Sequence, residues 1–150
     1  MSAATSLLSA GLHYAPAVIL DELGIKVTRT WLRDTWGVWS LDRRRIVIAS
    51  GLSEVQERCV LAHELEHVYA GDGECSSPLA GIRQERHADL EAARKLVAIS
   101  DLAAVAQWAG DPHTAAAELR VTERLLRVRL NDLRGEGWPW RPLDGSRIAG

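Results

Sequence analysis

The stretch Glu54 to Ala70, which reads EVQERCVLAHELEHVYA, predicts one long helix around which the rest of the chain is arranged. Its apolar residues recur at helical spacing, and Ser53 with Gln56 forms a capping box at its start. Inside it, the segment His63-Glu64-Leu65-Glu66-His67 places two imidazoles four residues apart. Side chains at that spacing lie on one helix face, so the two histidines can bind a single metal ion.

Two glutamates beside these histidines could act as the general base of a hydrolase. The pattern H-E-x-x-H assigns that role to Glu64, and the inverted pattern H-x-x-E-H assigns it to Glu66. At about 100° per residue, each glutamate lies roughly 80° from the bisector of the two histidines, so helical geometry leaves both assignments open. A metzincin is excluded, because Ala70 and Gly73 stand where that pattern requires Gly and His.

A third ligand has to come from another part of the chain, and Glu85 is the strongest candidate. Glu85 and Asp89 share a helix face, so the glutamate can reach the ion while the aspartate accepts the outer N–H of a ligating histidine. A site of this composition with one open position suits Zn²⁺, which lowers the pKa of a bound water to about 7. Mn²⁺ or Fe²⁺ would accept the same ligands.

Several of these residues also fit ordinary structural roles. Two histidines on a helix can simply face water, and Asp89 can be a solvated surface acid. Cys75 lies in a Gly-rich turn, where its thiolate is an alternative zinc ligand and a solvated thiol is the simpler assignment. His113 is expected at the surface, with a contact to an oxyanion or to substrate as the alternative.

These motifs resemble a known family, the ImmA/IrrE-like zinc metallopeptidases of bacteria and their mobile elements. The segments that carry the resemblance span most of the chain and are Asp21 to Val27, Trp36 to Trp39, Ile46 to Ile48, Arg58 to His67 and Glu85 to Asp89. The resemblance implies His63, His67 and Glu85 as ligands and Glu64 as the general base. It also implies an intracellular peptidase that cleaves helix-turn-helix repressors in phage, mobile-element or stress-response circuits.

The chain departs from that family at Glu66, where relatives usually carry Gly, so an additional acid lies beside the site. Its negative charge would raise the pKa of a bound water or alter the approach of substrate. The departure removes none of the three ligands.

The fold class is predicted to be α+β, with a helical zincin-like core and a small antiparallel sheet of about three strands. The first helix is expected to start near Pro16 and to end near Leu23, before Gly24. Residues 25–31, 37–40 and 45–49 are rich in β-forming side chains. The sheet should pack against helix 54–70, and an exposed edge strand there would let an extended substrate add itself as a further strand.

The chain of 150 residues, 47% of them hydrophobic, is long enough for one sizeable core. We predict a single metallopeptidase-like domain over residues 1–150. It would consist of a metal-binding core at 1–99, a helical, helix-turn-helix-like appendage at 100–134 and a tail at 135–150. The tail contains Trp138-Pro139-Trp140, which suits an anchor for a partner or for the chain's own core.

The net charge of -2 provides no overall attraction for nucleic acid or for an anionic membrane. Cys59 and Cys75 do not make a disulfide framework, so we expect a reducing, cytoplasmic location. Leu20-Asp21-Glu22 interrupts the apolar residues near the amino terminus, and no basic leader precedes them. Neither a signal peptide nor a membrane span is therefore expected.

Residues Ala117 to Leu130 are similar to the second and third helices of a helix-turn-helix, with Thr122 as the N-cap. In that arrangement Arg124 and Arg127 would face DNA phosphates. The basic signal is weak, because five arginines stand against three acids from Glu118 to Arg134. A helical lid over the core and a surface that recognises the protein target are the other two interpretations.

Together these features predict a zinc-dependent intracellular metalloendopeptidase that cleaves a protein target, which the resemblance identifies as a helix-turn-helix repressor. One alternative is a metal-stabilised regulatory protein that binds a repressor without proteolysis. The other is a DNA-binding module that uses the C-terminal helices. No membrane partner is expected.

Overall fold

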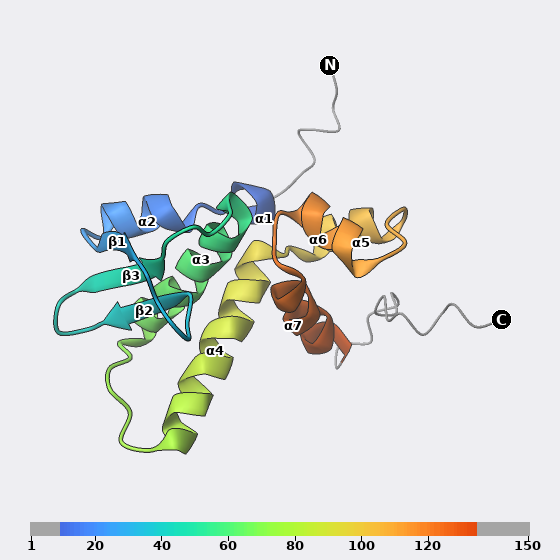
Figure 1. Ribbon diagram of the computed structural model, residues 1–150. Helices are drawn as coiled ribbons and strands as arrows, with labels where there is room; N and C mark the ends of the chain where they lie inside the picture. The colour runs from blue at the N-terminus through green and yellow to red at the C-terminus, as the bar shows by residue number, and fades with distance from the viewer. Residues whose placement is uncertain (1–9, 135–150) are drawn as a thin grey trace. The chain divides into compact units, whose positions relative to one another are not determined.

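The computed structural model describes residues 10–134 (Figure 1). Its elements are α1 (Ala10–His13), α2 (Pro16–Glu22), β1 (Lys26–Thr30), β2 (Gly37–Ser40), β3 (Arg45–Ala49), α3 (Glu54–Ala70), α4 (Pro78–Leu96), α5 (Ile99–Ala106), α6 (Pro112–Leu119) and α7 (Glu123–Arg134). They confirm the predicted α+β class. The described residues form two compact units, one of residues 15–92 and one of residues 10–14 with 93–134. The prediction of one domain that divides after residue 99 stays a prediction.

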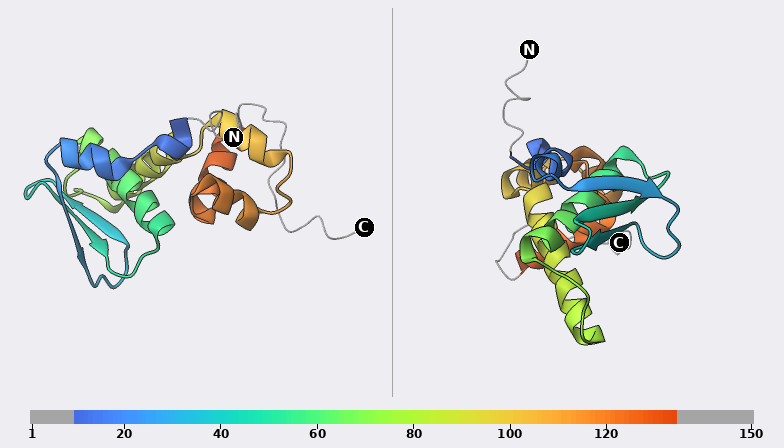
Figure 2. Two further views of the ribbon diagram at one scale, coloured as in Figure 1. Left: turned by 90° about the horizontal axis from the view of Figure 1, so that it is seen from above. Right: turned by 90° about the vertical axis from the view of Figure 1, so that its left-hand side faces the viewer.

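The sheet of the first unit is mixed, with strand order β1-β3-β2. β2 and β3 form the expected antiparallel hairpin, but β1 runs parallel to β3, with Val27 opposite Ile46. The prediction of an antiparallel sheet is therefore wrong for one of the two pairings. The reason is the connection of residues 31–36, which crosses the end of β3 and adds β2 to the edge of β3 opposite β1 (Figure 2).

The core of this unit lies between the sheet and its helices. Ile46 and Ile48 alternate along β3 with partly exposed residues and are fully buried on one face of the sheet. That face meets α3, which contacts both β2 and β3 (Figure 1). α2 packs on α3 through the fully buried Leu20. α2 begins at Pro16 and stops before Gly24, whose φ of 70° supplies the left-handed residue that ends the helix, as predicted.

The second unit is helical and holds its own core of leucines from α5, α6 and α7, the most buried of which are Leu102, Leu119, Leu125, Leu126 and Leu133. Asp111 caps α6 by accepting a hydrogen bond from the Thr114 N–H, and Thr122 caps α7 by accepting one from the Leu125 N–H. The predicted N-cap at Thr122 is therefore confirmed. The Trp138-Pro139-Trp140 segment lies outside the described residues.

No helix within residues 10–134 combines the length and the apolar character that crossing a lipid bilayer requires.

Candidate metal centre

Helix α3 holds both histidines in a fixed position within the first unit. Ser53 and Gln56 form the predicted capping box at its start, and Gly71 ends it with a φ of 67°. The middle of the helix is buried on nearly all sides, because it packs on the sheet and on α2. A buried helix with fixed ends holds its side chains in single rotamers, which is what a metal site needs.

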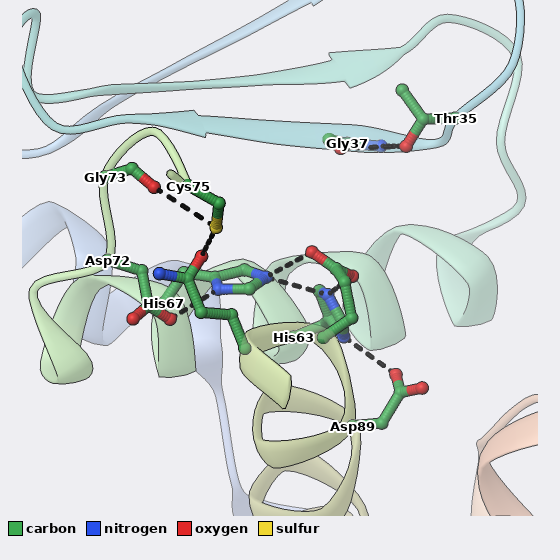
Figure 3. Close-up of polar contacts among 10 residues, drawn as sticks. Thr35, Gly37, His63, His67, Asp72, Gly73, Cys75 and Asp89 are labelled. Carbon is green, nitrogen blue, oxygen red and sulfur yellow. Dashed lines mark hydrogen bonds and ion pairs between the residues drawn. The ribbon is translucent and has the colours of Figure 1, made fainter. Parts of the chain in front are cut away.

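His63 and His67 point their ring nitrogens at each other across one turn of α3 (Figure 3). The two Nε2 atoms are 3.1 Å apart, and the rings meet edge to face with centroids separated by 4.8 Å. Glu85 of α4 completes the group. Its two carboxylate oxygens each lie 3.0 Å from one of these nitrogens.

Helix α4 can bring Glu85 to this point because the residues on its inner side are small. Ala88 and Ala92 are completely buried, as expected for a helix that approaches its neighbour closely. The Glu85 side chain itself is 63% exposed, whereas that of His67 is only 7% exposed. The group therefore has a buried floor on α3 and a side that opens to solvent.

Each histidine is held from behind by an aspartate. Asp89, one turn after Glu85, lies 2.8 Å from Nδ1 of His63, which is the orienting contact predicted from its position. Asp72, just after the end of α3, lies 2.8 Å from Nδ1 of His67 (Figure 3). Asp72 was not among the predicted site residues. Its signal is faint, because it depends on the left-handed Gly71 turning the chain back toward the last turn of the helix.

The hydrogen bonds between the two histidines and the two aspartates indicate whether the site suits a cation. If each Nδ1–H donates to its aspartate, each Nε2 presents a lone pair to the same point as the Glu85 carboxylate. Three electron-pair donors that converge, with ligand atoms all within 4.8 Å of one another, repel unless a positive charge lies between them. The donor set of two imidazoles and one carboxylate is also typical of a catalytic divalent metal site.

The pKa values of the histidines show the same negative environment. Burial lowers the pKa of His63, but hydrogen bonds to Asp89 and Glu85 outweigh it and raise that pKa to about 9. Burial also lowers the pKa of His67, but hydrogen bonds to Glu85 and Asp72 outweigh it, so the net pKa is raised. The pKa of Glu85 is held far below its usual range by hydrogen bonds to the two histidines. The site therefore attracts either protons or a metal ion.

Glu64 lies beside this group on the side of the sheet. Its side chain is buried, and burial raises its pKa although both histidines oppose the shift. The backbone N–H of Trp39 on β2 donates a hydrogen bond to it. Gly37 allows the contact, because a Cβ there would lie 2.6 Å from Cγ1 of Val60 and 3.0 Å from Oε1 of Glu64. Nothing in the sequence marked this approach of strand and helix.

Glu66 is also buried, with 4% of its surface exposed. Of the two glutamates, Glu64 is the one whose charge raises the pKa of both His63 and His67. Glu64 is also the one placed against β2. The choice between the forward pattern H-E-x-x-H and the inverted one stays a prediction.

Cys75 and His113, the two alternative site residues, each have a polar partner close in sequence. Among the described residues, Cys75 is outside the group whose ligand atoms converge, and its thiol donates to Oε1 of Gln84 at 2.9 Å. His113 belongs to α6 in the second unit, where its Nδ1 lies 3.0 Å from a carboxylate oxygen of Glu123. Its side chain is 86% exposed. A role for His113 toward substrate stays a prediction.

A helix with two histidines and an adjacent glutamate, joined by a carboxylate from the next helix and flanked by a small sheet, is typical of metal-dependent hydrolases of the metallopeptidase type. Comparison with known families gives the same class. The sequence model of the IrrE N-terminal-like domain, the peptidase M78 family, matches residues 20–131. The chain belongs to this family. No curated protein sequence matches it.

Proposed function

We propose that the chain is a zinc-dependent metalloendopeptidase in which His63, His67 and Glu85 hold the ion and Glu64 is the general base. The observation that carries the proposal is the convergence of two Nε2 atoms and a carboxylate next to a second, buried carboxylate. Zn²⁺ bound by such residues polarises a water and a substrate carbonyl. Mn²⁺ and Fe²⁺ remain chemically compatible with the same ligands.

Glu64 is suited to proton transfer by its surroundings. Burial raises its pKa, which brings the carboxylate closer to the neutral range in which a general base works best. Its hydrogen bond with the Trp39 N–H keeps the carboxylate oriented while leaving other lone pairs free to accept a proton. The same group can then donate that proton to the leaving amine nitrogen.

The edge of β2 provides a place for an extended peptide. β2 pairs with β3 on one side only, so within the described residues its other edge has no strand partner. Val38 of this strand and Trp36, which directly precedes it, are each 47% exposed. A substrate that pairs with β2 would run past Glu64, because Trp39 of the same strand contacts that residue.

We further propose that the target is a helix-turn-helix repressor in the cytoplasm, in a phage, mobile-element or stress-response circuit. Support comes from the family to which the chain belongs and from the resemblance to ImmA/IrrE-like peptidases. Co-expression of the chain with such a repressor, followed by immunoblotting, would show a shortened repressor. Intact repressor at unchanged abundance would contradict this target.

Cleavage itself can be tested without knowing the target. The zinc-loaded chain is incubated with a peptide library of mixed sequence, and new amino termini are identified by mass spectrometry. Glu64→Gln should lower the cleavage rate roughly 100- to 10,000-fold without loss of metal. Glu118→Gln, an exposed glutamate of α6, is the matched control and should cleave like the parent.

The alternative of a regulator that binds a repressor without proteolysis has a distinct outcome. A parent protein that holds one metal ion but produces no new amino termini, and whose cellular effect survives Glu64→Gln, would be such a regulator. Loss of the effect only in His63→Ala would support the same conclusion, because that change removes the metal.

A further inference from the structure

Helices α6 and α7 have the dimensions of a helix-turn-helix. α6 ends at Leu119, residues 120–122 form the turn, and α7 begins at Glu123. Arg120 adopts a left-handed conformation with a φ of 55°, which turns the chain sharply between the two helices. A turn of this length between two capped helices is the connection found in DNA-binding helix-turn-helix motifs.

The inner faces of the two helices pack as that motif requires. Small and apolar side chains at the crossing are buried, and they are Ala115, Ala116, Leu119, Val121 and Leu126. The alanines let the helices approach closely, and the leucines secure α7 on its neighbours. One side of α7 is thereby fixed inside the unit, and the residues on its opposite side are exposed.

Arginines dominate the solvent side of α7. Arg124, Arg127, Asn131 and Arg134 are all exposed and recur at i, i+3, i+7 and i+10, which puts them on one face. Exposed Arg120 of the turn precedes them. These five residues are called the arginine face below.

The two acids of α7 are placed differently relative to the arginine face. Asp132 is turned inward, where it is 8% exposed and accepts hydrogen bonds from Arg94 and Arg129. Glu123 lies in the first turn and pairs with His113 and Arg127. Glu123 therefore offsets one charge of the arginine face, and four arginines stand there against this single acid of α7.

We infer that the arginine face binds duplex DNA, a function beyond the proposed peptidase activity and independent of it. In this arrangement α7 enters the major groove and the guanidinium groups contact phosphates. Asn131 is the amide side chain of the face, and amides of this kind read adenine edges in the major groove. The positive charge complements the phosphate backbone, and the helix-turn-helix connection favours DNA over an acidic protein.

The test is fluorescence anisotropy with the full zinc-loaded chain and a labelled duplex of mixed sequence, roughly 30 base pairs or three helical turns long. The parent is expected to bind with an affinity that falls as salt rises. The variant Arg124→Gln/Arg127→Gln should bind at least about 10-fold more weakly, and its slope of log affinity against log salt should be shallower by about 2.

Matched controls separate the arginine face from general charge. Arg33→Gln/Arg43→Gln removes two exposed arginines from the first unit and should bind DNA like the parent. Glu64→Gln should also bind DNA normally even where it abolishes cleavage, so the failure of either proposal can be recognised separately. Circular dichroism of each variant should show the parent's helical content.

Three results would overturn the inference. The first is a parent protein that binds no duplex at low salt. The second is an equal loss of binding in both double variants. The third is displacement of the duplex by polyglutamate as readily as by unlabelled DNA at equal charge, which would identify the arginine face as a surface for an acidic protein.

Discussion

The Oδ2 atom of Asp72 lies 2.8 Å from Nδ1 of His67, although the two residues sit on opposite sides of the end of α3. Gly71 between them adopts a left-handed conformation, and the Asp72 N–H donates to the carbonyl oxygen of His67 at 3.0 Å. The same short segment therefore ends the helix and orients a ligand of the proposed metal site. Asp89 does the equivalent for His63 from a different helix.

Asp72→Asn should weaken zinc binding by about 10- to 100-fold, because a carboxylate behind a ligating imidazole fixes its tautomer and raises its basicity. Competition with a chromophoric zinc chelator measures the dissociation constant. Asp34→Asn, an exposed aspartate of the loop before β2, serves as the control and should leave it unchanged. An Asp72→Asn variant with the parent's zinc affinity would show that the 2.8 Å contact has no influence on the metal.

Gly37→Ala should damage activity more than a single methyl group normally would. Its Cβ would meet Val60 and Glu64, so β2 or the Glu64 carboxylate has to move. We expect a loss of about 1–3 kcal/mol in the free energy of unfolding, as for overpacked cores, together with a fall in kcat. Urea unfolding and peptide cleavage measure the two effects.

Gly110→Ala is the matched control for that experiment, because nothing lies within 4 Å of a Cβ at Gly110. It should change neither the free energy of unfolding nor cleavage by much. A Gly37→Ala variant that behaves like Gly110→Ala would show that β2 can move away from α3 without consequence for Glu64.

Local patterns predicted much of this fold because they act over a few residues. The capping box at Ser53, the end of α2 at Gly24 and the three β-rich segments depend on neighbours in sequence, and all appear in the structure. The parallel pairing of β1 with β3 was not predicted, since it depends on the path of residues 31–36. Such a path reflects tertiary packing more than any local preference.

The candidate site divides in the same way. The pattern of α3 and α4 was enough to bring His63, His67 and Glu85 together as candidates, because helical spacing relates side chains on one face. The contacts of Asp72 and of Trp39 were not predicted. They connect a turn and a strand to the helix, and no residue type or spacing in the sequence predicts such contacts.

The metal-free protein should lose stability as pH rises from about 6.5 to about 9. Burial lowers the pKa of His63, yet hydrogen bonds to Asp89 and Glu85 raise it to about 9 in the folded state. In the unfolded chain a histidine titrates near about 6.5, so the stabilisation is complete below that pH and is lost as pH approaches 9. Thermal unfolding in the presence of a chelator measures the change.

His63→Ala should flatten that pH dependence, whereas His113→Gln, a change at an exposed histidine of the other unit, should keep it. Zinc binding near pH 7 should also release protons, because the ion replaces them on the imidazoles. A metal-free parent whose melting temperature rises between pH 6.5 and 9 would contradict the charge state inferred for His63.

Asp132→Asn should destabilise the helical unit. Arg94 donates two hydrogen bonds to this carboxylate, at 3.0 and 2.7 Å, and Arg129 donates a third at 2.6 Å. The Arg129 guanidinium is buried and also donates to the carbonyl oxygen of Val97, so loss of the aspartate leaves a buried cation without its counter-charge. Removal of one partner from such a pair costs roughly 3 kcal/mol, which urea unfolding at pH 7 would detect.

The pH dependence of stability separates the effect of the Asp132 charge from the effect of its packing. Hydrogen bonds from Arg94 and then Arg129 hold the pKa of Asp132 below its usual range. A depressed pKa contributes stability that is complete above the unfolded value of about 3.9 and is lost as pH falls through the folded value. The difference in free energy of unfolding between the parent and Asp132→Asn should therefore become smaller as pH drops below about 4. If that difference stays constant with pH, Asp132 stabilises the unit through the packing of its side chain rather than through its charge.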